Sequence, residues 1–168
     1  MSASRRLSPL LPAAAVLALT LSASGGCKSK RQAFEGIELS TLSGAQTVGL
    51  AHCPTPKCLT VIVAPWCGYC RSSTGLIKDL DRYLLGKGVT TRVVVGQDAL
   101  SPVKEYAAMF GPQTLLDPTG QVYVQGVPQF IASDASGRLL KSTGGVPNGL
   151  QAPYDDDVLA QLARMYGI

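Results

Sequence analysis

The feature that most constrains this chain is a pair of cysteines, Cys67 and Cys70, placed between a strand pattern and a helix pattern. A β-branched, apolar run at residues 60–64 precedes the pair, and residues 71–85 carry apolar side chains at helical spacing. A strand that leads through two cysteines into a helix places the first sulfur at the helix N-terminus. Unpaired backbone N–H groups favour negative charge there, so we expect Cys67 to ionise more easily than a free thiol.

The spacing of the two cysteines predicts thiol–disulfide exchange, with a different role for each sulfur. Cys70 lies one helical turn beyond Cys67, close enough to form a reversible disulfide with it. We expect Cys67 to attack a substrate disulfide and the more buried Cys70 to resolve the mixed disulfide. Trp66 directly precedes Cys67. We expect its ring to flank the active sulfur as an apolar platform for substrate; packing within the fold is the alternative.

Two motifs together resemble the thioredoxin superfamily. The sequence Trp-Cys-Gly-Tyr-Cys at residues 66–70 is similar to the active sites of thioredoxin and protein disulfide isomerase domains, and its last four residues resemble those of bacterial periplasmic disulfide isomerases. The second motif, Gly-Val-Pro at residues 126–128, opens a late apolar strand. The resemblance covers residues 38–168 in element order. It implies a thiol:disulfide oxidoreductase that uses protein thiols and disulfides as substrates, with a membrane redox partner and no cofactor or metal.

The resemblance also assigns a substrate site beside the cysteines. It implies that Pro128 is cis and that it places the Val127 backbone across from Cys67, where Val127 can pair with an extended substrate strand. One position departs from the family pattern. Thioredoxins carry a buried acid six residues before the first cysteine, and this chain has Val61 there. No carboxylate in residues 59–65 can accept the proton of Cys70, and His52, the only histidine, is expected to be a surface residue.

The first 26 residues have the pattern of an export signal of the lipoprotein type. Arg5 and Arg6 precede an apolar stretch at residues 7–21, and small residues lead to Cys27. Cys27 resembles the lipidated cysteine of bacterial lipoproteins, although Ser24 departs from that pattern. Ordinary signal cleavage and an uncleaved anchor are the alternatives. We expect an exported protein on the periplasmic side, anchored in the membrane by Cys27, with a flexible tether over residues 27–36 and one domain over residues 37–168.

A second cysteine pair, Cys53 and Cys58, precedes the first. The loop between them contains two prolines, and disulfides persist in exported proteins, so we expect a structural disulfide. An auxiliary redox pair, free thiols and metal ligands are the alternatives. A zinc site made of all four thiolates is a rival interpretation of the two pairs. A redox-inactive module that binds a partner is another.

The remaining pattern predicts an α/β fold, a central mixed β-sheet flanked by helices with a short insertion before the cis-proline. We expect strands near residues 37–42, 59–64 and 89–95, the last two forming a parallel pair around the helix at 71–85. Residues 113–125 form the insertion, in which residues 122–124 are a possible short strand. A hairpin at residues 130–142 and a helix at 155–166 follow.

The net charge argues against nucleic acid binding, and the order of the elements bears on the kind of oxidoreductase. The formal net charge of +4 falls to +2 without Arg5 and Arg6, which is too small to indicate nucleic acid binding. A disulfide isomerase or a reductant for cytochrome or copper-site maturation remains an alternative to a general oxidoreductase. An isomerase usually needs a dimerisation region, and the residues before 37 leave no room for one, which argues against the isomerase. We expect a monomer.

Overall fold

The structure is a computed structural model that describes residues 33–168. The expected signal segment and Cys27 lie outside the described residues. Phe34 is 3% exposed, and the N–H of Ala33 donates to the carbonyl of Gly137 at 2.9 Å. The folded domain therefore begins before residue 37, inside the segment expected to be a tether.

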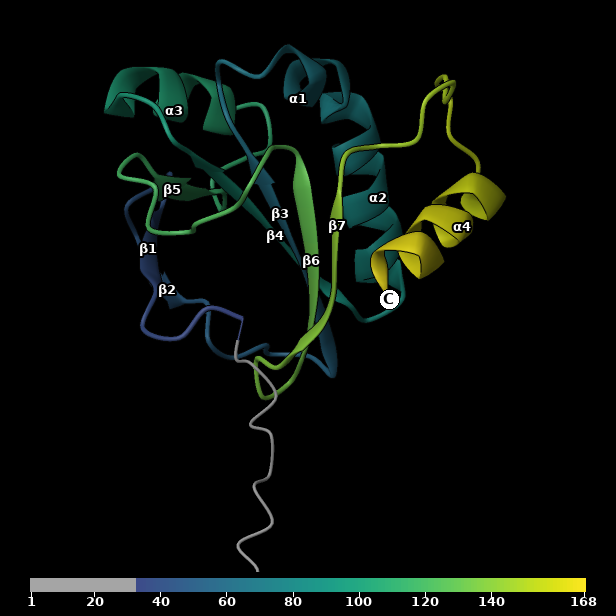
Figure 1. Cartoon of the computed structure of the whole chain (residues 1–168), viewed down its shortest axis with the longest axis horizontal. Coiled ribbons are helices and arrows are strands. Elements are labelled where there is room, and N and C mark those ends of the chain that lie inside the picture. Colours follow the sequence, from purple (N-terminus) through teal and green to yellow (C-terminus); the bar gives the residue numbers. More distant parts are fainter. Residues whose placement is uncertain (1–32) are drawn as a thin grey trace, which may run out of the picture.

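A seven-stranded mixed sheet forms the centre of the molecule (Figure 1). Its strands run in the order β2-β1-β5-β4-β3-β6-β7. Their bounds are β1 (Glu38–Thr41), β2 (Thr47–Gly49), β3 (Lys57–Val63), β4 (Thr90–Gly96), β5 (Leu115–Asp117), β6 (Gln129–Asp134) and β7 (Leu139–Gly144). β4 pairs in parallel with β3 and β5, whereas every other pair is antiparallel. The parallel pair predicted from the strand–helix–strand pattern is confirmed.

In the described part of the chain, four helices accompany the sheet: α1 (Gly68–Ser72), α2 (Thr74–Gly86), α3 (Leu100–Ala107) and α4 (Asp156–Tyr166). The single helix expected at 71–85 is thus two, divided at Ser73. Side-chain hydroxyls explain the break, because Ser72 donates to the Tyr69 carbonyl and Thr74 to the Cys70 carbonyl, in competition with the helical bonds. No helix within residues 33–168 is long and apolar enough to cross a membrane.

The two faces of the sheet are covered differently. Helices α2, α3 and α4 pack against one face in a single apolar cluster, in which the Tyr166 ring of α4 stacks on Phe130 of β6 at 3.9 Å. The other face is covered by the segment containing Phe34 and by loops that contribute Leu50 and Val122. β3 alternates between the two clusters and is buried on both faces, as its continuous apolar run predicts.

Two short strands were not predicted. β2 pairs with β1 as a hairpin, and β5 lies between β1 and β4 inside the region predicted as an insertion. The possible strand at residues 122–124 is wrong, because these residues form no strand. Instead, the Asp117 carboxylate accepts the N–H of Val122 at 2.8 Å and holds this segment as a loop.

Candidate active site

The sharp turn after β3 places Cys67 at the start of α1. Cys67 is the N-cap of that helix, and its extended backbone, with ψ at 104°, leads the chain into the first turn. The Cys70 N–H donates to the Cys67 sulfur at 3.0 Å. A side-chain atom of the N-cap residue commonly accepts an otherwise unpaired N–H at this position. In the reduced protein the same N–H would stabilise negative charge on this sulfur.

Cys67 and Cys70 form a disulfide, with their Cα atoms 5.2 Å apart. Cys67 is 7% exposed, whereas Cys70 is completely buried. Cys67 is therefore the sulfur nearer to the surface, in agreement with the predicted order of attack and resolution.

The Val127–Pro128 segment lies across from Cys67. The carbonyl oxygen of Val127 is 3.5 Å from the Cys67 sulfur, and the Val127–Pro128 peptide bond is cis, as the resemblance implies. Pro128 immediately precedes β6, which pairs with β3, so the sheet brings the two motifs together across sixty residues of sequence. A second cis bond, between Ala152 and Pro153, was not predicted.

Trp66 projects from the surface beside Cys67. Its side chain is 61% exposed, so the alternative that the ring packs in the core is not what the structure shows. The indole Nε1 donates to the carbonyl of Gln97 at 2.9 Å. The only polar group of the ring is thus used inside the protein, and the exposed part is apolar.

Tyr69 connects α1 to the loop between β7 and α4. Its hydroxyl donates to the carbonyl of Val146 at 2.5 Å and lies 3.2 Å from the side-chain oxygen of Asn148. A cavity of about 180 Å³ lies between Tyr69, Leu76 and this loop. These residues were missed in the sequence, because nothing in the local pattern of residues 145–150 indicates a contact with a helix start 77 positions earlier.

Replacing Tyr69 by phenylalanine should loosen this loop. The change removes an exposed hydrogen bond, of a kind that contributes at most about 1 kcal/mol, so we expect faster amide hydrogen exchange at residues 146–150. The matched control is Tyr123→Phe, because Tyr123 is 86% exposed. Equal exchange rates in the two variants would contradict a role for the Tyr69 hydroxyl.

The surroundings of Cys70 contain hydroxyls rather than an acid. Val61, at the position of the family acid, is fully buried in the apolar core. Thr74 Oγ1 donates to the Cys70 carbonyl and lies 3.1 Å from the Tyr106 hydroxyl. Burial raises the pKa of Tyr106, so this hydroxyl stays protonated at neutral pH. His52 is exposed in the loop before β3, at the other end of that strand from Cys70.

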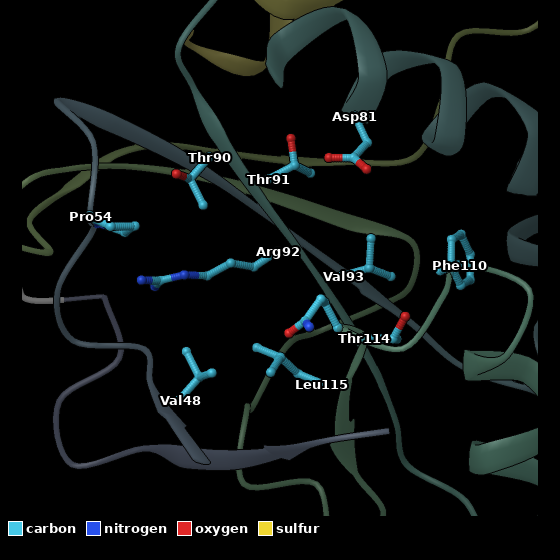
Figure 2. Close-up of a pocket in the computed structure, with 11 residues that line it drawn as sticks. Val48, Pro54, Asp81, Thr90, Thr91, Arg92, Val93, Phe110, Thr114 and Leu115 are labelled. Carbon is cyan, nitrogen blue, oxygen red and sulfur yellow. The ribbon is translucent and has the colours of Figure 1, made fainter. Parts of the chain in front are cut away.

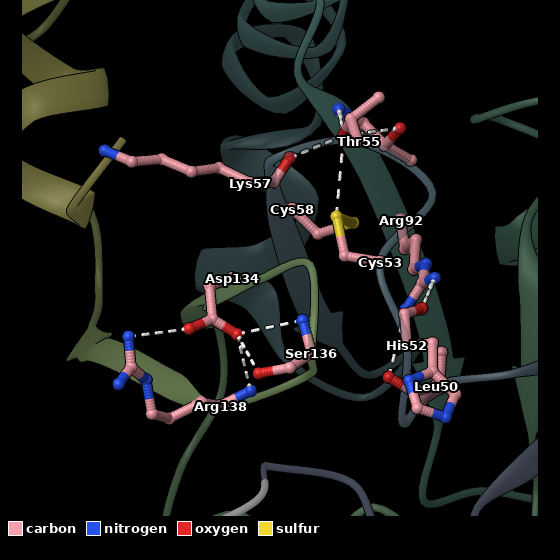
Figure 3. The surroundings of a disulfide bond; sticks show 11 residues. Leu50, His52, Cys53, Thr55, Lys57, Cys58, Arg92, Asp134, Ser136 and Arg138 are labelled. Atoms are coloured by element: carbon pink, nitrogen blue, oxygen red, sulfur yellow. Dashed lines mark hydrogen bonds and ion pairs between the residues drawn. A yellow bond between two sulfur atoms is a disulfide. The ribbon is translucent and has the colours of Figure 1, made fainter.

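The second cysteine pair also forms a disulfide, between Cys53 and Cys58 (Figure 3). Cys58 lies near the start of β3, and the active pair follows the end of β3. Residues 58–63 of an extended strand span about 16 Å, so the two disulfides are at opposite ends of the strand. The four sulfurs therefore form two separate disulfides in this structure and not one site, as a zinc centre made of all four thiolates would require.

Buried Arg92 fixes the loop that carries this second disulfide. Its guanidinium donates to the carbonyls of Leu50, at 3.1 Å, and His52 (Figure 3). Thr55 adds a second anchor, since its Oγ1 accepts the N–H of Thr90 at 3.1 Å. Burial lowers the pKa of Arg92. The loop is therefore attached to β4 at two points as well as closed by the disulfide.

Replacing Arg92 by lysine should lower the free energy of unfolding by about 1–2 kcal/mol. A lysine ammonium cannot reproduce the fork that reaches two carbonyls at once, and one buried acceptor would lose its partner. Urea denaturation measures the change. The control is Arg82→Lys, because Arg82 is exposed and forms a surface ion pair with Asp79. A loss no larger than in that control would show that the carbonyl contacts of Arg92 do not stabilise the loop.

A cavity of about 240 Å³ lies along β4, away from the active cysteines (Figure 2). Arg92 extends from this strand toward the loop of Pro54, while Asp81 approaches from α2 (Figure 2). Asp81 is half-buried, and its partial burial raises the pKa of the carboxyl above the ordinary value of 3.8. Its charge therefore opposes folding at neutral pH.

Replacing Asp81 by asparagine should stabilise the protein at pH 7 by up to about 0.5 kcal/mol, a small value because solvent screens a half-exposed group. The folded-state pKa is the higher one, so the wild-type penalty is absent below pH 3.8 and grows as the pH rises through the folded-state pKa. Urea denaturation at pH 3 and pH 7 checks this sign. A variant that is less stable than wild type at pH 7 would contradict it.

Comparisons with known proteins address the fold. No protein-family model matches this sequence, and no curated protein sequence is significantly similar to it. Among solved structures, the exposed lipoprotein thioredoxin Etrx1 of Streptococcus pneumoniae is 20% identical with a TM-score of 0.58, and the match covers 77% of this chain and 98% of that one.

Two further structures are similar. A secreted Mycobacterium tuberculosis disulfide oxidoreductase homologous to Escherichia coli DsbE is 16% identical with a TM-score of 0.53, covering 77% of this chain and 93% of that one. StoA from Bacillus subtilis is 14% identical with a TM-score of 0.54, covering 74% and 93%. At these identities the similarity shows the fold, and the predicted thioredoxin-like fold is confirmed.

Proposed function

We propose that this protein is an extracytoplasmic thiol:disulfide oxidoreductase that exchanges disulfides with protein substrates through Cys67 and Cys70. The observation that carries the proposal is the position of the Cys67 sulfur. It lies 3.0 Å from the N–H of Cys70 and 3.5 Å from the Val127 carbonyl, at a helix start opposite Pro128. A sulfur at a helix start, with one N–H directed at it and a second cysteine one turn away, suits attack on a disulfide.

In the reducing direction, the Cys67 thiolate attacks one sulfur of a substrate disulfide. The substrate S–S bond breaks, a Cys67–substrate disulfide forms, and the released substrate thiolate takes a proton. The Cys70 sulfur, as a thiolate, then attacks Cys67, which releases the second substrate thiolate and forms the Cys67–Cys70 disulfide. The substrate gains two electrons and the protein loses two. The oxidising direction is the reverse.

The substrate site includes Trp66, Val127 and Pro128. An extended substrate segment beside Cys67 could pair with the Val127 backbone, in the way that peptides add to the edge of a sheet. The exposed apolar surface of Trp66 would contact the side chains that flank the substrate cysteine. Disulfide-bonded or dithiol proteins are therefore the proposed substrates.

Export and membrane attachment belong to the same proposal. The signal pattern that ends at Cys27 supports lipidation of that residue, and the similarity to an exposed lipoprotein thioredoxin is consistent with it. A membrane protein that exchanges electrons with the Cys67–Cys70 pair is the proposed redox partner. We propose that the protein acts as a monomer and that the Cys53–Cys58 disulfide is structural.

Equilibration in glutathione buffers tests the proposed function. The Cys67–Cys70 pair should titrate as one two-electron couple, and catalytic amounts of protein should accelerate exchange of a disulfide-bonded peptide. A potential near −270 mV would indicate a reductant and one near −120 mV an oxidant. Absence of any acceleration over an equal concentration of a small dithiol would overturn the proposal.

A further inference from the structure

The orientation of Trp66 depends on one backbone oxygen. Its Nε1 donates to the carbonyl of Gln97 at 2.9 Å, and Gln97 directly follows β4. The rest of the ring is exposed. The place of the exposed ring beside Cys67 is therefore set partly by the direction of the Gln97 carbonyl.

Gln97 has an uncommon backbone conformation. Its φ is 60°, and within residues 33–168 it is the only residue other than glycine with a positive φ. A side chain with a Cβ disfavours this left-handed region. A neighbouring group must therefore hold the residue in place, and the N–H of Gln97 donates to the carbonyl of Asp117 at 3.1 Å.

Asp117 is at the centre of a network that reaches Gln97. It ends β5 and is 1% exposed. Its two carboxylate oxygens accept the N–H groups of Gln121 and Val122, both at 2.8 Å, while its backbone carbonyl also accepts the N–H of Gly120 at 3.1 Å. One buried carboxylate thus folds the loop that leads to Val127, and the same residue's carbonyl holds Gln97.

The absence of a Cβ at Gly96 allows the Asp117 backbone to approach this closely. A Cβ added to Gly96 would lie 2.4 Å from the Asp117 carbonyl oxygen, too close for any other residue without a shift of the backbone. Gly120 lies on the other side, where an added Cβ would contact the Gln97 side chain at 3.8 Å. The end of β5 and the residue after β4 therefore form one packed unit.

We propose that Asp117 is a positioning residue that acts on substrate binding through Gln97 and Trp66. By fixing the loop at residues 118–126 and the Gln97 carbonyl, it holds the Trp66 ring where an apolar side chain next to the substrate cysteine can dock. The inference rests on the proposed function and adds a substrate preference, namely polypeptides with a bulky apolar residue beside the cysteine. Asp117 itself does not touch the sulfurs.

Asp117→Asn tests the proposal, because the amide nitrogen would face a backbone N–H and remove one of the two loop bonds. Trp66 is the only tryptophan of the chain, so its emission and its quenching by acrylamide report its position directly. We expect increased quenching and a KM about tenfold higher for a disulfide peptide with phenylalanine beside its cysteine, the effect expected from one lost charge-assisted hydrogen bond. The exchange rate with oxidised glutathione and the pH at which Cys67 ionises should not change.

The matched control is Asp134→Asn. Asp134 also accepts backbone N–H groups in a turn that ends in glycine, from Ser136 at 3.0 Å and Arg138 at 3.1 Å, but at the far end of β6 from Pro128. This variant should leave the Trp66 emission and the KM unchanged. Wild-type values of quenching and KM in Asp117→Asn, or equal changes in both variants, would overturn the proposal.

If Asp117→Asn does not fold, a second pair of variants tests whether the Gln97 backbone positions Trp66. Both variants keep the backbone carbonyl of residue 97. The asparagine of Gln97→Asn tolerates a positive φ, whereas the β-branched valine of Gln97→Val disfavours it. We expect increased Trp66 quenching in Gln97→Val alone, and identical quenching in the two variants would overturn the proposal. The fluorescence measurements need no exchange activity, so an inactive wild-type protein would reject the proposed function separately.

Discussion

Cys67→Ser should abolish catalysed disulfide exchange, whereas Cys70→Ser should keep the first chemical step. A serine hydroxyl in place of Cys67 cannot form the mixed disulfide on which the reaction depends. With Cys70 replaced, Cys67 can still attack, but the mixed disulfide has no resolving thiol and should accumulate. The rate with a disulfide peptide measures the first effect, and electrophoresis without reductant measures the second.

The reverse pattern would contradict the assignment of the nucleophile. If Cys67→Ser remained active while Cys70→Ser lost all reaction with substrate, the attacking sulfur would be Cys70. The burial of the two residues argues against this result, since Cys70 is completely enclosed. Serine is close in size to cysteine, so neither variant should disturb the packing around α1.

Removing the second disulfide should lower stability rather than activity. For the double variant Cys53→Ala/Cys58→Ala we expect the free energy of unfolding to fall by about 2 kcal/mol, the loop-entropy value for a short closed loop. The exchange rate at 25 °C should stay within about twofold of wild type, because the two disulfides are at opposite ends of β3. Urea denaturation and the peptide exchange assay measure the two quantities.

Alkylation mapping in graded redox buffers provides the control for this prediction. Cys53 and Cys58 should remain oxidised under conditions in which Cys67 and Cys70 are reduced. Contacts to Arg92 and Thr55 fix the loop that carries Cys53 against β4, so the folded protein holds these two sulfurs together. If the two pairs titrated together, or if the double variant lost exchange activity at full stability, a redox role for the second pair would be indicated.

Structure was predicted best where the residues that determine it are neighbours in the sequence. The strand, the two cysteines and the following helix are contiguous, so the start of α1 and the burial order of Cys67 and Cys70 could be predicted. The continuous apolar run of β3 likewise predicted a central strand buried on both faces. The cis state of Pro128 was implied by family resemblance and not by the residues alone, since a trans bond is the usual state of X–Pro.

Features that depend on contacts between distant segments were not predictable in the same way. β5 is only three residues long, and its pairing with β1 and β4 comes from tertiary contact rather than from a strand pattern. The break at Ser73 depends on hydroxyls that could equally have faced solvent. The contacts of Trp66 with Gln97 and of Tyr69 with Val146 join residues 31 and 77 positions apart.

Mapping the mixed disulfide of the Cys70→Ser protein identifies the sulfur that attacks the substrate. The protein, in which Cys53 and Cys58 are retained, is incubated with a disulfide-bonded peptide, alkylated and digested for mass spectrometry. We expect the peptide to be attached through a disulfide to Cys67 and to no other cysteine. Attachment at Cys53 or Cys58, or the absence of any adduct while the Cys67→Ser protein forms one through Cys70, would contradict it.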